Sequence, residues 1–63
     1  MQMILKVDGM SCQHCVARVK KALEAAGAQN VTVSLDAAEA VFEAADERQV
    51  YIEAVEDVGF DAE

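Results

Sequence analysis

Two cysteines separated by two residues are the part of this sequence that could do chemistry. They lie in the segment Cys12-Gln13-His14-Cys15, and on a helical turn residues three apart face the same side. A thiolate is both a nucleophile and a ligand for soft metal ions such as copper(I). The segment therefore predicts an accessible site for one soft metal ion, with copper(I) as the best candidate and Cys12 and Cys15 as its ligands.

Other interpretations of the pair stay open at this point. Structural zinc takes four ligands, whereas this segment adds only His14, so zinc would need a dimer or an outside ligand. A thiol–disulfide redox site uses the same spacing, but the chain lacks the proline and the tryptophan of thioredoxin-like sites. Two structural cysteines would suit an apolar stripe better than the polar neighbours Ser11 and Gln13. Mercury or another soft ion would bind the same thiolates.

Size and charge exclude several classes of protein. The 63 residues suffice for a single domain, 1–63, and no apolar run reaches the roughly 20 residues of a membrane span, so we expect no direct membrane insertion. The net charge of −7 disfavours nucleic acid as a partner, because phosphate binding requires clustered cations. The start lacks a basic leader and two cysteines are few for a secreted mini-domain, so we expect free thiols in the cytoplasm.

The first half of the chain predicts a strand, a loop and a helix. Apolar residues alternate over 3–7, which is typical of a strand, and the loop 8–12 follows. From Gln13 onward the apolar residues recur at three- and four-residue steps, which is typical of an amphipathic helix. This stripe consists of Val16, Val19, Leu23 and Ala26. Gly27 is expected to end the helix.

The second half predicts two strands, a second helix and a short last strand. The strands cover 31–35 and 40–44, with a hairpin turn over 36–39 between them. Asp46 is expected to cap the helix, and Gly59 to end it. The inner face of this helix is predicted to hold Tyr51, Ala54, Val55 and Val58. The last strand is predicted over 60–62.

The order βαββαβ predicts an α+β fold of the ferredoxin-like type, with two helices on one face of a four-stranded antiparallel sheet. In that arrangement the cysteine pair lies where a loop enters the first helix. The unpaired N–H groups and the positive end of the helix dipole stabilise a thiolate there.

The segment Gly9–Cys15 resembles the GMxCxxC motif of the heavy-metal-associated domain. The resemblance covers essentially the whole chain, including the ending Val58-Gly59-Phe60-Asp61. It implies that Cys12 and Cys15 are the metal ligands. It also implies the ferredoxin-like fold that the order of elements predicts.

Other positions acquire roles from the same resemblance. Met10 matches the methionine that packs beneath the metal loop without binding the metal. Ser11 stands where zinc-exporting members often have aspartate, which favours copper(I). Phe60 matches a position close to the site, or is simply a core residue. His14 could tune the thiols or contact a second copy, or it is a solvated side chain.

The length is similar to that of bacterial copper chaperones of the CopZ type. The resemblance implies a soluble copper(I) metallochaperone that passes its ion by ligand exchange to a copper-transporting P-type ATPase. Such a protein is not an enzyme. A metal-binding domain excised from such an ATPase fits the same residues, and so does a metal-bridged homodimer; a redox protein is a weaker alternative. Arg18, Lys20 and Lys21 follow the site and either steer an acidic partner or only aid solubility.

Overall fold

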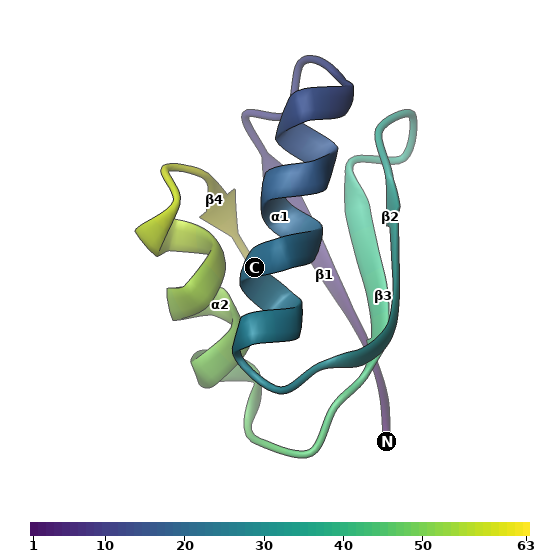
Figure 1. Cartoon of the computed structure of the whole chain (residues 1–63), viewed down its shortest axis with the longest axis vertical. Coiled ribbons are helices and arrows are strands. Elements are labelled where there is room, and N and C mark those ends of the chain that lie inside the picture. The colour runs from purple at the N-terminus through teal and green to yellow at the C-terminus, as the bar shows by residue number, and fades with distance from the viewer.

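The fold is a four-stranded antiparallel sheet with both helices on one face (Figure 1). The computed structural model describes residues 1–63. The elements are β1 (Gln2–Asp8), α1 (Gln13–Ala25), β2 (Gln29–Ser34), β3 (Glu39–Glu43), α2 (Arg48–Asp57) and β4 (Asp61–Ala62). The strand order is β2-β3-β1-β4, with every neighbouring pair antiparallel. This confirms the predicted α+β ferredoxin-like βαββαβ fold. Neither helix has the length and apolar character that a bilayer crossing requires.

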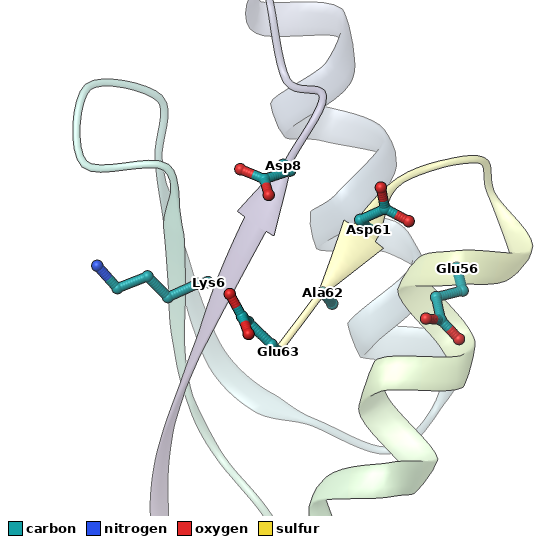
Figure 2. Close-up of a pocket in the computed structure, with 6 residues that line it drawn as sticks. All are labelled: Lys6, Asp8, Glu56, Asp61, Ala62 and Glu63. Carbon is teal, nitrogen blue, oxygen red and sulfur yellow. The ribbon is translucent and has the colours of Figure 1, made fainter.

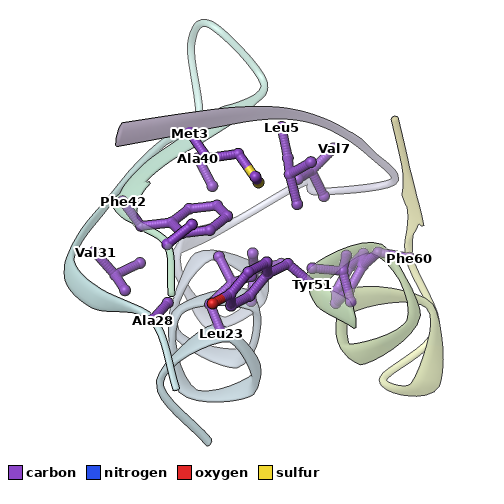
Figure 3. Packing of buried hydrophobic residues seen from close by; sticks show 13 residues of the cluster. Met3, Leu5, Val7, Leu23, Ala28, Val31, Ala40, Phe42, Tyr51 and Phe60 are labelled. Atoms are coloured by element: carbon purple, nitrogen blue, oxygen red, sulfur yellow. The ribbon is translucent and has the colours of Figure 1, made fainter. Parts of the chain in front are cut away.

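A single core fills the space between the sheet and the helices (Figure 3). Alternate residues of β1 point into it, and each helix buries two residues of its predicted apolar stripe, Val19 and Leu23 in α1 and Tyr51 and Val55 in α2. The buried residues are Met3, Leu5, Val7, Val19, Leu23, Ala28, Val31, Ala40, Phe42, Ala44, Tyr51, Val55 and Phe60. None is charged, so folding removes no unpaired ion from water.

Both helices end as the sequence predicts, at Gly27 and Gly59. These glycines have φ of +103° and +98°. The Gly27 and Gly59 N–H groups donate to Glu24 and Glu56, three residues back. The next N–H in each case reaches five residues back, to the C3 carbonyl. This pair of hydrogen bonds is typical of a helix that ends with a residue in the left-handed conformation.

The hairpin turn between β2 and β3 covers 35–38, not the predicted 36–39. Ala38 takes the left-handed conformation at φ +54°, a position where the sequence offers no glycine. The Ser34 hydroxyl accepts a hydrogen bond from the Ala37 N–H at 3.2 Å, and the Ala38 N–H donates to the Leu35 carbonyl at 3.3 Å. The Ser34 side chain thus stabilises the turn where no glycine is present, and the turn begins one residue earlier than predicted.

The start of α2 differs from the prediction. Glu47, not Asp46, is the N-cap residue, and it makes no side-chain cap hydrogen bond. The Asp46 N–H and the Ala45 N–H instead donate to Tyr51 Oη, at 3.1 and 2.9 Å. The buried Tyr51 therefore fixes the approach to the helix, and no capping carboxylate is needed there.

Two further predictions at the C-terminal end need correction. Val58 is exposed, although it was expected on the inner face, because α2 ends at Asp57 and the chain turns away. The last strand covers only Asp61–Ala62, since the Phe60 N–H still donates to the Val55 carbonyl of α2 and the Phe60 side chain is buried in the core.

We expect Tyr51→Phe to lower the free energy of unfolding by about 1–3 kcal/mol, because it leaves two backbone N–H groups without their acceptor. The ring is retained, so its packing against Phe42, with centroids 4.9 Å apart, is unaffected. Urea denaturation followed by circular dichroism measures the change. A loss below about 0.5 kcal/mol would mean that water replaces the hydroxyl.

Candidate metal site

The two thiols lie side by side where the loop after β1 enters α1. Cys12 Sγ and Cys15 Sγ are 3.8 Å apart, and neither is in a disulfide. Cys12 is exposed, whereas Cys15 is half-buried and packs against the core. The structure thus brings together the two residues predicted from their spacing, with one sulfur open to an incoming group.

Helix α1 begins with a cysteine as its N-cap residue. Cys12 has an extended backbone, and its carbonyl accepts the N–H groups of Cys15 at 3.1 Å and Val16 at 3.3 Å. Its side chain makes no cap hydrogen bond, and the first turn holds no acidic residue. The positive end of the helix therefore meets no acidic side chain of its own first turn.

The pKa of the Cys15 thiol is lowered from its ordinary value. The main cause is a hydrogen bond from the backbone N–H of Ser11, which stabilises the thiolate. Partial burial raises the pKa and so opposes the shift. Hydrogen bonds from Cys12 and from the Ser11 hydroxyl, which lies 3.9 Å from Cys15 Sγ, lower the pKa further. A lower pKa means that more of the thiol is in the form that binds soft metals at neutral pH.

We expect Ser11→Ala to raise the pKa of Cys15 without restoring its ordinary value, because the backbone N–H remains. The chains with Ser11 and with Ser11→Ala are compared in a Cys12→Ser background, where Cys15 is the only thiol and the pH dependence of its alkylation rate gives its pKa. The lowered pKa contributes stability that is complete above the ordinary thiol pKa of about 8.5 and is lost as pH falls through the folded-state pKa. An unchanged dependence of alkylation rate on pH would show that the Ser11 hydroxyl does not lower the pKa of Cys15.

The spacing of the sulfurs is close to what a metal ion needs. With metal–sulfur bonds of about 2.3 Å, as for zinc, sulfurs 3.8 Å apart subtend roughly 110° at the metal, and a linear arrangement needs about 4.6 Å. A sulfur movement of under about 1 Å therefore converts a bent site into a linear one. The exposed Cys12 can make this movement, since Cys15 is held by Ser11 and by the core.

The loop that leads from β1 to the cysteine pair packs on two apolar residues. Met10 is half-buried and packs against the core, as expected for a residue that supports the loop. Phe60 is buried beneath Gly9, so close that a Cβ on Gly9 would lie 3.3 Å from Phe60 Cδ1. Gly9 also has φ +101°, so both backbone and space favour glycine there. The pattern of residues could not reveal this contact, because the two residues are far apart in the sequence.

No third ligand joins the pair within the chain. No cluster of three His, Cys, Asp or Glu side chains suited to a metal occurs, and His14 is exposed. A four-ligand site would therefore need groups from a second molecule.

A depression lined mainly by charged residues lies elsewhere, beside β4 (Figure 2). It measures about 220 Å³ and includes neither cysteine. Its lining residues are Lys6, Asp8, Glu56, Asp61, Ala62 and Glu63. The cations Arg18, Lys20 and Lys21 are exposed on α1, and none forms an ion pair.

Comparisons with known proteins agree with this geometry. Residues 4–61 match the heavy-metal-associated domain. A probable copper-exporting P-type ATPase of Archaeoglobus fulgidus is 48% identical over 61 residues, which are 97% of this chain and 8% of the ATPase. The copper chaperone CopZ of the same organism is 45% identical over 58 residues, which are 92% of this chain and 28% of the chaperone. The solved structure of a CopZ metallochaperone superposes with a TM-score of 0.91 at 31% identity, covering all of both chains.

Proposed function

The chain belongs to the heavy-metal-associated domain family, and on that basis we propose that it carries copper(I), bound by Cys12 and Cys15, to a copper-transporting P-type ATPase. The observation that supports this most directly is the pair of sulfurs 3.8 Å apart, one exposed and one held. Two thiolates satisfy copper(I) and leave room for a third. Binding through two thiolates requires reduced cysteines, and cysteines stay reduced in the cytoplasm. We therefore propose a cytoplasmic location.

The proposed transfer is an exchange of ligands. A thiolate of the partner bonds to the bound copper(I), which becomes three-coordinate, and one original copper–sulfur bond then breaks. The departing thiolate takes up a proton and the incoming thiol has released one, so neither oxidation nor reduction occurs. Cys12 is the first to leave, because it is exposed, whereas Cys15 is half-buried, packs against the core and contacts Ser11. No bond within a substrate changes, so the protein is not an enzyme.

A metal-binding domain of a longer transporter is the alternative, and the 48% identity to a P-type ATPase supports it. The two relatives share this domain but differ in overall length, since the chain spans 8% of one and 28% of the other. Ligand exchange through Cys12 and Cys15 would be the same in either protein. The length of the open reading frame that encodes this chain distinguishes them.

The proposal is tested by mixing the copper(I)-loaded chain with the metal-free metal-binding domain of a copper ATPase under anaerobic conditions. We expect copper to have moved to the acceptor by the time the two proteins are separated by gel filtration. Zinc should not stay bound to the chain under the same conditions, because two thiolates supply only half of the four ligands that zinc takes. Retention of copper by the chain after equilibration with excess acceptor would contradict the carrier function.

The cations of α1 are expected to guide this encounter. Reversing the charge of Arg18, Lys20 and Lys21 to glutamate should slow transfer about tenfold at low salt, with a smaller effect at high salt. Stopped-flow measurements at two salt concentrations give the rates. Reversal of Lys6, which is exposed on β1, is the control. Equal rates for the wild type and the triple variant would exclude this steering.

A further inference from the structure

The face of the sheet that points away from the helices carries a row of apolar side chains. Both helices cover the other face (Figure 1). Ile4 of β1 lies directly opposite Val41 of β3, and Val41 lies opposite Thr32 of β2. Directly opposite residues share a face of the sheet, so these three side chains form one row across three strands. Ile4 is 48% exposed, Thr32 is exposed and Val41 is half-buried.

Carboxylates flank this row. Glu39 and Glu43 lie two residues before and two residues after Val41 on β3, so all three point to the same face. A strand rises about 3.4 Å per residue, which places each carboxylate about 7 Å from Val41 along the strand. Further along the same face, Asp8 of β1 lies directly opposite Asp61 of β4, where the two like charges repel each other. The apolar row and these carboxylates together form the open face.

Few cations oppose the carboxylates of the open face. Lys6 lies opposite Glu39 but forms no ion pair with it, and the N-terminal ammonium is 3.5 Å from Glu43 in a contact between exposed groups. Such exposed pairs contribute little. Arg48 donates to the Ile4 carbonyl at 3.0 Å, but it belongs to α2 on the covered face. The outward side chains of β1 and β3 comprise three carboxylates and one cation, so their net charge is −2.

The open face is centred on strands that are paired on both sides. In the order β2-β3-β1-β4, the two inner strands are β3 and β1, which carry Val41 and Ile4. The apolar row therefore does not depend on how far the short strand β4 extends. An exposed apolar patch with a polar rim is typical of a surface that binds another protein.

We propose that the open face binds a basic amphipathic helix of a partner protein. The three strands that carry the row span roughly 10 Å, which is about the diameter of a helix with its side chains. A helix aligned with β3 would place an apolar residue over Val41 and Ile4. Glu39 and Glu43 are about 14 Å apart along the strand, close to the roughly 12 Å between helix positions i and i+8. The partner helix therefore carries lysine or arginine at i and i+8 and a large apolar residue at i+4.

Other occupants fit the charge of this face less well. A second copy of the chain would bring two negative faces together, and the chain as a whole carries −7. Nucleic acid and anionic membranes are repelled by the same carboxylates. A basic protein segment is attracted by them, and charge complementarity of this kind also fixes the register of the two partners. Because α1 covers the opposite face, one protein could hold the chain here while α1 stays accessible to another.

The test uses the metal-free full chain and an acetylated, amidated, alanine-rich helical peptide of about 18 residues, since shorter helices are marginal in water. The peptide carries one central leucine, with lysine four residues before and four residues after it. We expect its addition to shift the amide signals of Ile4 and Val41, as measured by nuclear magnetic resonance. The same peptide with glutamate in place of lysine is the control, and we expect it to bind at least about tenfold more weakly.

Neutralising the carboxylates beside the row tests the charge. Glu39→Gln combined with Glu43→Gln should weaken binding of the lysine peptide about tenfold at low salt, with a smaller effect at high salt. Glu53→Gln combined with Glu56→Gln makes the same change in charge on α2 and should weaken binding less than about twofold.

Shortening the exposed side chain of the row tests the apolar contact. Ile4→Ala should weaken binding about fivefold, because less apolar surface is covered. Val50→Ala is the matched control on α2, since Val50 is 41% exposed, and it should weaken binding less than about twofold.

Four results would overturn the proposal. They are signal shifts confined to the helices, equal binding of the glutamate peptide, no shift at millimolar lysine peptide, and shifts that follow protein concentration without peptide. The last would assign the open face to a second copy of the chain. Since no metal is present, the outcome is independent of copper binding.

Discussion

Replacing Cys12 or Cys15 with serine is expected to lower the affinity for copper(I) by more than about 100-fold. The loss of even an outer partner of a metal ligand weakens binding about 10–100-fold, and here one of only two sulfurs 3.8 Å apart disappears. A serine hydroxyl is a hard, protonated ligand that does not replace a thiolate for a soft ion. Anaerobic titration against a chelator of known affinity measures the change.

His14→Ala is the matched control, because His14 lies between the cysteines and is exposed. Its affinity should stay within about threefold of the wild type, since outer residues without a contact to the ligands contribute little. Binding of one copper per two chains would indicate a shared, metal-bridged site. Unchanged affinity in both cysteine variants would exclude the proposed ligands.

Phe42→Ala is expected to unfold most of the protein at room temperature. Phe42 is almost fully buried and packs against the ring of Tyr51, so its truncation should cost about 3–5 kcal/mol. A domain of 63 residues buries a small core, and its total stability is about the same size. Circular dichroism and urea denaturation measure the folded fraction.

Ile4→Ala is the control on the same sheet. Ile4 is 48% exposed on the open face, so we expect a loss below about 1 kcal/mol and a cooperative unfolding transition. If Phe42→Ala were no less stable than Ile4→Ala, the core would not lie between the sheet and the helices.

The sequence predicts the parts of this fold that depend on periodicity. The alternation of Met3, Leu5 and Val7 and the stripe of Val19 and Leu23 each specify a buried face, and the structure confirms both. The glycine stops at the helix ends also follow from local chemistry. The cysteine pair could be located because its spacing and its place at a helix start are both local properties.

What the sequence could not predict depends on contacts between distant segments. Asp46 has the side chain of a helix cap, but Tyr51 Oη takes the role of acceptor once the chain is folded. The alanine at φ +54° in the hairpin is tolerated only because the strands on either side fix it. The contact of Gly9 with Phe60 and the bond of Arg48 to Ile4 arise in the same way.

The absence of a side-chain cap at Cys12 has a consequence for the charge balance of the site. Copper(I) with two thiolates carries one negative charge, which the uncapped start of α1 stabilises. A divalent ion with the same two thiolates is neutral and gains nothing from the helix. Loss of the proposed ion would leave two adjacent anions, whose repulsion favours proton uptake, so binding and release would be linked to proton exchange with solvent. In the proposed copper(I) complex, the helix start would therefore discriminate by the charge of the loaded site, in addition to the softness of its sulfurs.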